Sequence, residues 1–353
     1  MTKAYLALQD GTVMEGESAG AQGTYIGEVV FTVGMAGAIE FLTDPAYEGQ
    51  ILTMAYPIIG GAGVNLEDAE SNRAHVRALV VREVCDFPNN FRMQMDLDTY
   101  LKEQNVIGIT GLDTRKLVKI LRDSGAQNGM VTTDPDFSFE KYREQLNGYR
   151  RKVDLANVTR ERQVISGVGK RVALLDLGAK NSTIAAMQEL DCQITVYPAM
   201  TAAEEILNSG YDGIVIAGGA GDPREYPEVM ETVRQLAQSG KPVLGINLGM
   251  QLLALAYGAA VTALPHGHRG GHPVKDMATQ HTFVAQQNSG YAIDTDSVDK
   301  NAMEITYVNM SDGAVEGLAW KNIPVRAVQF YPDLSHDTKH IWQQMNAWMG
   351  GEQ

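Results

Sequence analysis

Cysteine is scarce in this chain, and long apolar runs are missing. Cys85 and Cys192 are the only cysteines in 353 residues, too few for a disulfide framework and typical of a reducing compartment. No apolar run approaches the roughly 18 residues that a membrane-spanning helix needs. No basic segment followed by an apolar run marks a signal peptide at the N-terminus. We therefore expect a cytoplasmic protein with no membrane partner.

Positive charge is also in short supply, because 29 Lys and Arg residues face 43 Asp and Glu residues. The formal net charge of −14 argues against nucleic acid or an anionic membrane as a partner. Hydrophobic residues make up 44% of the chain, which is ordinary for a protein that buries a large core. The length suggests two domains or one large one.

The N-terminal part reads as a self-contained α+β domain. Residues 4–8 and 12–14 flank an Asp-Gly turn and predict a hairpin. Residues 114–124 predict a helix with apolar side chains along one side. We place this domain at 1–134 and a looser, polar and glycine-bearing linker at 135–169.

The second domain, at 170–353, alternates regularly between strands and helices. Four apolar strand-like runs are each followed by a helical segment, at 171–177, 193–197, 213–217 and 242–246. Strand–helix units in series predict a parallel sheet that is doubly wound, with helices on both faces. The expected fold class is therefore α/β, with the α+β domain in front of it.

The last of these units contains a sharp turn between strand and helix, Gly245-x-Asn247-x-Gly249. This is the shape of a nucleophile elbow, which lifts one side chain above the end of a sheet and leaves backbone N–H groups free to hold an oxyanion. Here the lifted residue is Asn247, and an amide is not a nucleophile at neutral pH. The sequence thus has the architecture of a covalent catalyst without its reacting atom.

A glycine-rich loop at 218–223 follows another strand and is expected at the same edge of the sheet. Its N–H groups and those of the elbow are placed to converge on one anion or oxyanion. The alternative is that the glycines only make a tight turn. The loop matches neither the dinucleotide-binding fingerprint nor the phosphate loop.

Three histidines, His266, His268 and His272, cluster in a stretch rich in glycine and proline. We expect this stretch to be a loop. It contains no cysteine or carboxylate that would complete a metal site, so we expect no metal. Cys192 stands at the start of a strand, the wrong end for a nucleophile, and is interpreted as a core residue.

Short motifs in both domains carry a resemblance to one family. They are Gly27-Glu-Val-Val-Phe31, Leu42-Thr-Asp-Pro45, Asp113-Thr-Arg-Lys-Leu117, Gly125-Ala-Gln-Asn-Gly129, Leu177-Gly-Ala-Lys-Asn181, Gly219-Ala-Gly-Asp-Pro223, Leu248 to Ala256, His272-Pro-Val-Lys-Asp276, Gln287-Asn288 and Val328-Gln-Phe330. The chain resembles the small subunit of carbamoyl-phosphate synthetase over nearly its whole length except the linker. The C-terminal half of that subunit is a class I glutamine amidotransferase.

The resemblance implies a division of labour in a complex. The family's small subunit hydrolyses glutamine without a cofactor, and ammonia passes to a large synthetase subunit that uses ATP and bicarbonate. The family's elbow carries a cysteine, activated by a histidine that a glutamate orients. At these three positions this chain has Asn247, Tyr331 and Asp333.

These replacements predict the loss of glutaminase activity. The reference pKa of tyrosine is near 10, so Tyr331 is a poor base at neutral pH. Losing the nucleophile or the base alone costs on the order of 10⁶ in kcat in a comparable triad. Asn tolerates the left-handed backbone region better than most residues, so Asn247 is expected to occupy a strained elbow.

Part of the glutamine pocket is retained by resemblance. Family glutamine-contacting positions correspond to Gly219, Gly221, Leu248, Gln251, Asn288 and Gly290, while Tyr291 replaces a phenylalanine and Ala46 replaces a serine. Either the pocket still binds a glutamine-like ligand or these residues are inherited packing. Both interpretations stay open at this point.

Three functions follow from these observations. The first is a non-hydrolytic subunit that docks on or regulates a synthetase large subunit, which then draws on free ammonia. The second is a stand-alone binding or sensor protein for a glutamine-like molecule. The third is an enzyme of altered chemistry that uses Tyr331, Asp333 or the histidine cluster, and it ranks lowest because no nucleophile is paired with a base. The pathway served, arginine, pyrimidine or neither, is left open.

Overall fold

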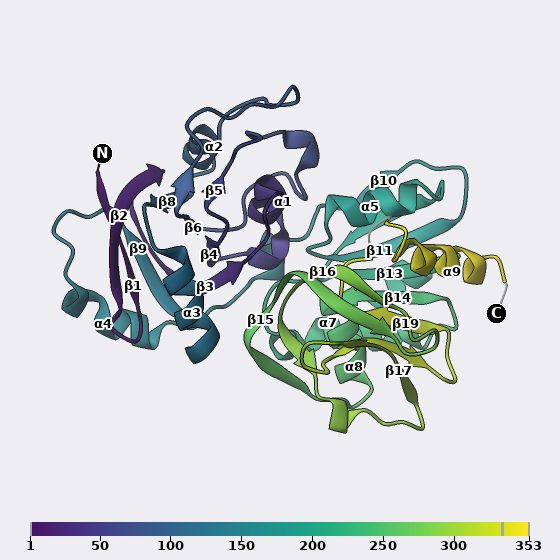
Figure 1. The fold of residues 1–353 in the computed structure, drawn as a ribbon. Coiled ribbons are helices and arrows are strands. Elements are labelled where there is room, and N and C mark those ends of the chain that lie inside the picture. The colour runs from purple at the N-terminus through teal and green to yellow at the C-terminus, as the bar shows by residue number, and fades with distance from the viewer. Residues whose placement is uncertain (1, 333–334, 352–353) are drawn as a thin grey trace. The chain divides into compact units, whose positions relative to one another are not determined.

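The structure is a computed structural model that describes residues 2–332 and 335–351. The chain divides into two compact units, residues 1–152 with 265–267, and residues 153–264 with 268–353. The division falls inside the segment 135–169 that the sequence assigns to a linker. The two units are described separately below, and Figure 1 colours them along the chain from purple to yellow.

The N-terminal unit is built on a closed barrel with the strand order β1-β2-β8-β6-β4-β3-β9. These strands are β1 (Lys3–Leu8), β2 (Val13–Gly20), β3 (Thr24–Thr32), β4 (Gln50–Met54), β6 (Ala78–Val80), β8 (Ile107–Thr110) and β9 (Gln127–Thr132). The expected hairpin near the N-terminus is confirmed, since β1 pairs with β2 in antiparallel register. The sequence did not predict that the sheet closes.

Helices and short elements complete this unit. They are α1 (Ala38–Thr43), α2 (Leu97–Glu103), α3 (Thr114–Ser124), α4 (Phe139–Gly148), β5 (Ile58–Ile59), β7 (Glu83–Val84), η1 (Pro45–Tyr47) and η2 (Leu66–Asp68). The predicted helix α3 begins where the Asp113 side chain accepts a hydrogen bond from the Lys116 N–H, at 3.0 Å, and ends at Gly125 with φ 86°. Its apolar side, Leu117, Val118 and Leu121, packs into the barrel core.

The C-terminal unit contains one sheet with the order β10-β12-β11-β13-β14-β19-β18-β16-β15-β17. Its strands are β10 (Gln163–Ile165), β11 (Arg171–Leu177), β12 (Gln193–Pro198), β13 (Gly213–Gly218), β14 (Val243–Asn247), β15 (Val261–Asp276), β16 (Thr282–Ile293), β17 (Met303–Asn309), β18 (Val315–Trp320) and β19 (Val325–Val328). Strands β12, β11, β13 and β14 are parallel, as predicted. Strand β19 also joins them in parallel, and the remainder pair antiparallel.

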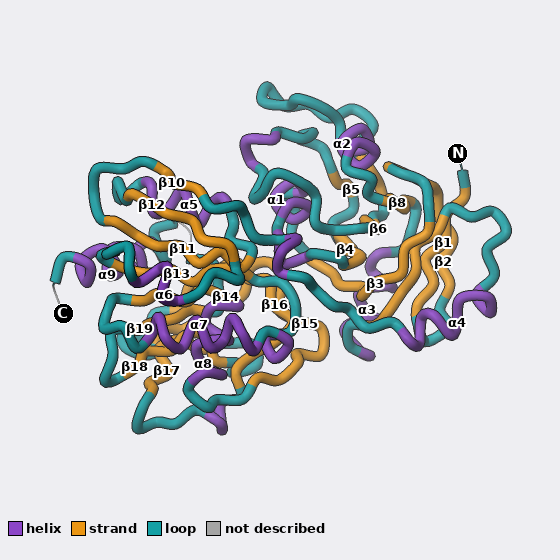
Figure 2. The backbone as a smooth tube through the Cα atoms, turned by 180° about the vertical axis from the view of Figure 1, so that it is seen from behind, coloured by secondary structure: helices purple, strands orange, loops and turns teal. Residues whose placement is uncertain are grey.

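Helices cover both faces of this sheet, which confirms the doubly wound fold. They are α5 (Asn181–Gln188), α6 (Ala203–Leu207), α7 (Pro227–Ala237), α8 (Leu248–Ala256) and α9 (Lys339–Met349), with short turns η3 (Leu155–Asn157), η4 (Pro223–Glu225) and η5 (Thr295–Ser297). Residues of α6, α7 and α8 share one apolar core, and residues of α5 and α9 share the other. Figure 2 shows α7 and α8 side by side against the orange strands.

Strand β11 shows why the sheet is buried on both faces. Its alternate residues Ala173, Leu175 and Leu177 enter the core under α6 to α8, whereas Val172 and Leu174 enter the core under α5 and α9. Because both sides of a central parallel strand meet helices, the sequence reads as a continuous apolar run. In open α/β sheets the functional site lies at the carboxyl ends of the parallel strands, and the candidate site is sought there.

The prediction of a loop around the three histidines is wrong. His266, His268 and His272 lie in β15, which pairs with β16 from His268 to Lys275 across a register shift after Ala263. Gly267 and Gly270 adopt φ values of 71° and 92° there, a conformation that irregular strands accept at glycine. Long-range pairing with β16 overrides the local preference for a loop.

Within the segments that the structure describes, no helix is both long enough and apolar enough to cross a membrane.

Candidate functional site

The elbow forms at the junction of β14 and α8. Asn247 ends the strand with φ 54° and ψ −109°, and the helix begins at Leu248. The positive φ agrees with the expectation of a strained turn, but this ψ lies outside the left-handed helical region, so the ease of Asn in that region does not explain the residue. Such sparsely populated backbone states cost about 1–3 kcal/mol and cluster at functional sites.

Close packing around the turn explains the glycine that follows it. A Cβ on Gly249 would lie 2.0 Å from the carbonyl oxygen of Ile216 in the neighbouring strand β13. No side chain fits there, since real contacts of a Cβ essentially never fall below 3.0 Å. The elbow is therefore fixed against the sheet by backbone contact, whichever residue stands at position 247.

The Asn247 side chain is buried and hydrogen-bonded at both ends. Its Nδ2 donates to the Tyr331 hydroxyl at 2.8 Å and to the Asn288 carbonyl at 2.9 Å. Its Oδ1 accepts from Nε2 of Gln329 at 2.8 Å. The amide thus links the end of β14 to β16 and to the segment that follows β19, with its polar capacity largely used.

Gln251 extends this polar network by one helical turn. Its Nε2 lies 3.0 Å from the Ser289 hydroxyl, 3.1 Å from the Tyr291 carbonyl and 3.2 Å from Oε1 of Gln329. Gln329 therefore touches both amides, and sequence reasoning assigned it no role. The sequence pattern at the end of β19 did not show toward which face of the sheet the Gln329 side chain would point.

Tyr331 is the residue that the sequence predicts at the position of the family's base. It is 6% exposed, and its N–H donates to the Gln286 carbonyl at 2.9 Å. The ammonium of Lys180 lies 4.5 Å from the centroid of its ring, a favourable cation–π distance. Asp333, the remaining residue of the predicted triad remnant, lies outside the described residues.

The glycine loop lies beside the elbow, as predicted, because Gly218 and Asn247 are parallel neighbours in β13 and β14. Gly221 has φ 88°, and a Cβ there would fall 1.9 Å from the Tyr226 hydroxyl. That hydroxyl donates to the Val153 carbonyl at 3.0 Å. A packing reason for Gly221 is therefore present, which weakens the case that it was kept for an anion.

The other predicted pocket residues take these positions. Leu248, Gln251 and Asn288 are buried, and Gly219, Gly290 and Tyr291 are partly exposed. The guanidinium of Arg224 lies 5.6 Å from the centroid of the Tyr291 ring.

Ala46 belongs to the N-terminal unit, where it lies buried in η1. Its N–H donates to Asp44 at 2.9 Å, and its carbonyl accepts from Arg151 at 3.1 Å. Arg151 also donates twice to the Glu48 carbonyl. The backbone of this segment is therefore held in place by several hydrogen bonds.

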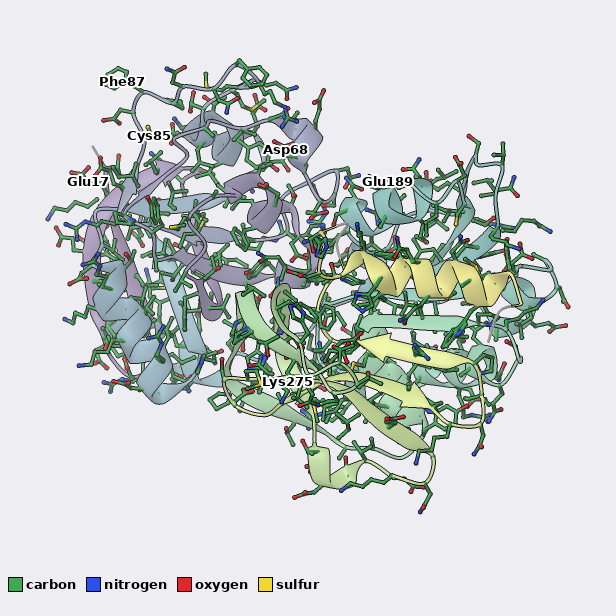
Figure 3. The ribbon with its side chains drawn as sticks, turned by 45° about the vertical axis from the view of Figure 1, so that its right-hand side comes forward. Glu17, Asp68, Cys85, Phe87, Glu189 and Lys275 are labelled. Carbon is green, nitrogen blue, oxygen red and sulfur yellow. The ribbon has the colours of Figure 1, made fainter. Side chains whose placement is uncertain are left out.

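Neither cysteine is a candidate nucleophile at the elbow. Cys192, directly before β12, is 1% exposed, and burial raises the pKa of its thiol to about 11. Cys85 lies in the N-terminal unit, where Figure 3 labels it. Among the residues that the structure describes, no group of three or more His, Cys, Asp or Glu is arranged to hold a metal ion.

A charged cluster, buried at His268 and Glu316 and exposed at Asp312, lies beside the elbow network, and sequence reasoning did not find it. His268 contacts Asp312 through Nε2 at 2.7 Å and Glu316 through Nδ1 at 3.5 Å. Glu316 is fully buried; its Oε1 accepts from Asn309 at 3.0 Å, while its Oε2 has no hydrogen-bond partner in the described chain. The Glu316 carbonyl accepts from the Gln329 N–H at 2.9 Å. Because the Gln329 side chain hydrogen-bonds to Asn247, this cluster supports a segment that contacts the elbow.

The stability of the protein should depend on the charge of His268. Burial alone would lower the pKa of its imidazole, but the hydrogen bond to Glu316 and the charges of Asp312 and Glu316 raise it above its usual value. A raised pKa stabilises the folded state fully below the unfolded value of about 6.5, and this contribution is lost as pH rises through the folded pKa. A tenfold gain in proton affinity on folding corresponds to about 1.4 kcal/mol of stability.

The measurement is urea unfolding of wild type and His268→Gln between about pH 5.5 and 8.5, a range that spans the reference pKa of histidine. We expect the free-energy difference between them to shrink as pH rises. His281→Gln, at an exposed histidine, is the control and should change nothing. A difference between wild type and His268→Gln that stays constant across this range would contradict the assignment.

The geometry defines the class of this protein. The family "Glutamine amidotransferase class-I" matches residues 173–344, which include the parallel sheet, the elbow and the glycine loop. The family "Carbamoyl-phosphate synthase small chain, CPSase domain" matches residues 6–131.

Curated relatives match over the whole chain. The carbamoyl phosphate synthase small chain of Clostridium perfringens is 43% identical over 97% of this chain and 98% of its own length. That of Listeria monocytogenes serotype 4b is 40% identical over 100% of this chain and 98% of its own length. The chain belongs to the carbamoyl-phosphate synthase small chain family.

A solved structure also matches, the glutaminase domain of Trypanosoma brucei CTPS with bound acivicin. It has a TM-score of 0.43, shares 17% identity, and the match covers 52% of this chain and 95% of that domain.

Proposed function

We propose that this protein is a small chain that does not hydrolyse glutamine and instead docks on a synthetase large chain as a structural or regulatory subunit. The observation that carries the proposal is the 2.8 Å hydrogen bond between the Asn247 amide and the Tyr331 hydroxyl. In a working site a nucleophile and its base stand at this distance. Here neither partner has the chemistry, so the large chain would draw on free ammonia.

The docking role is supported by what the chain retains. The small-chain family partners a large synthetase subunit in general, and the domain specific to that family is present from residue 6 to residue 131. The elbow and its surroundings are also well packed, as the Gly249 contact shows. A fold maintained around a site without reactive groups favours a role that depends on the fold.

The sensor alternative receives less support. The amides of Asn247 and Gln251 would face a glutamine-like ligand. Both ends of the Asn247 amide and the Nε2 of Gln251 already hydrogen-bond to protein groups. A ligand must compete with these internal bonds, and each exchange is worth only about 1 kcal/mol net. Altered chemistry through the histidine cluster is not supported either, because His268 is buried in ion pairs.

The test is reconstitution with the large chain from the same host. We expect the two chains to co-purify in equal amounts and to form carbamoyl phosphate from ammonia, ATP and bicarbonate, but not when glutamine replaces ammonia. The large chain alone is the control for any stimulation by this subunit. Glutamine-dependent synthesis would refute the proposal, and so would the absence of any complex.

A further inference from the structure

Exposed apolar side chains gather on one surface of the N-terminal unit. Met35 is 72% exposed, Val33 54%, Ile58 45% and Tyr56 39%. Single exposed apolar residues need no explanation, but contiguous ones mark interaction sites. The question is therefore whether these four residues form one surface.

Two hollows join them. One, of about 690 Å³, is lined by Val33, Met35 and Tyr56 together with residues of α3. The other, of about 390 Å³, is lined by Met35, Tyr56 and Ile58 together with residues of α1 and of the segment 90–92. Because Met35 and Tyr56 line both hollows, the apolar residues form a continuous groove.

Positive charge borders the larger of these two hollows. Arg115 and Lys119 line it from one side of α3, four residues apart, and both are exposed. Neither forms an ion pair with any described residue. Asp123 is the one acidic residue that lines this hollow. The other hollow is lined by Glu40 and by Asp68, which pairs with Arg92. In a chain with a net charge of −14, two unpaired cations beside an apolar groove are suited to an acidic partner surface.

A neighbouring loop adds two aromatic side chains. Phe91, which is 97% exposed, stands between Asn90 and Arg92, and both of these line the second hollow. Phe87 is 89% exposed, and Figure 3 shows it at the outer side of the same loop. Aromatic side chains at interfaces supply much of the binding energy.

We propose that Val33, Met35, Tyr56, Ile58, Arg115 and Lys119, here called the Met35 surface, form the docking site for the synthetase large chain. The inference rests on the proposed function and adds the location of the contact. The chemistry of the site specifies the partner segment, which inserts an apolar side chain into the groove and places carboxylates against Arg115 and Lys119. The barrel unit provides this site independently of the elbow.

The experiment measures the Kd between this chain and the purified large chain by calorimetry, for wild type and two variants. Met35→Asp and the double variant Arg115→Glu/Lys119→Glu should each weaken binding roughly 10- to 100-fold. Added salt should weaken the wild-type complex more than that of the double variant, because salt screens the charge pairs. All substituted residues are exposed, and circular dichroism confirms that each variant is folded.

Matched controls make the same chemical changes elsewhere. Met200→Asp, at a methionine that is 59% exposed, and Lys300→Glu/Lys339→Glu, at two exposed lysines, should leave the Kd unchanged. If both Met35-surface variants bind the large chain with the wild-type Kd, this inference is wrong and the proposed function stands. No binding by wild type would overturn both.

Discussion

Purified protein should release no ammonia from glutamine above a heat-killed control. The expected deficit is on the order of 10⁶ in kcat against a small chain that carries cysteine and histidine at the two reacting positions. The physical reason is that the Asn247 amide has no nucleophilic lone pair to offer, and the Tyr331 phenol that contacts it is a poor proton acceptor at neutral pH. A coupled glutamate dehydrogenase assay measures the release.

Two variants make this prediction sharper. Asn247→Cys should stay inactive, because its thiol would face a phenol instead of an imidazole. Asn247→Cys combined with Tyr331→His should gain measurable turnover, because the two side chains already meet within hydrogen-bond distance, at 2.8 Å. Ammonia release by wild type, or full activity of the single variant, would show that another group acts as nucleophile or base.

Trp342→Ala should cost more stability than almost any other single change in the C-terminal unit. Trp342 is 1% exposed on α9, packs into the core under α5 and α9, and donates from Nε1 to the Pro332 carbonyl at 2.6 Å. Truncating a buried tryptophan costs about 3–5 kcal/mol. Because Pro332 follows Tyr331 directly, the same substitution should also loosen the segment that carries Tyr331.

The control is on the same helix. Trp348 is partly exposed and stacks on Arg326, whose Cζ lies 4.3 Å from its ring centroid. Such a contact is worth about 0.5–1 kcal/mol at exposed sites, so Trp348→Ala should be mild. Urea unfolding followed by circular dichroism measures both. If both variants lose the same free energy of unfolding, burial of the Trp342 ring adds no more stability than the partly exposed Trp348 ring.

Local patterns in the sequence predicted the parts of the fold that local physics controls. The run from Arg171 to Leu177 reads as a strand buried on both faces, and it is one. The junction at Asn247 reads as an elbow, and it is one, with Gly249 required by the contact to Ile216. The replacement of the family's reacting residues stays a prediction, made from the residues at positions 247, 331 and 333.

Long-range pairing decided the rest. Closure of the N-terminal barrel requires β1 to meet β9, strands more than a hundred residues apart, and no local signal encodes that contact. The segment from His268 to Lys275 has the glycine and proline of a loop, yet β16 draws it into a strand. The domain limits at 134 and 169 remain predictions from composition, although the compact units divide between them.

What the sequence alone determined is the scaffold of a glutamine amidotransferase and the presence of an amide, Asn247, at its elbow. Only the tertiary structure decided which contacts that amide makes. Asn247 meets Gln329 and Tyr331 across 82 and 84 residues of chain, and these contacts make the side chain at the elbow a buried hydrogen-bonded link. The identity of a side chain limits the chemistry that it can perform. Packing brings its partners together from distant parts of the chain and so decides which interactions it makes.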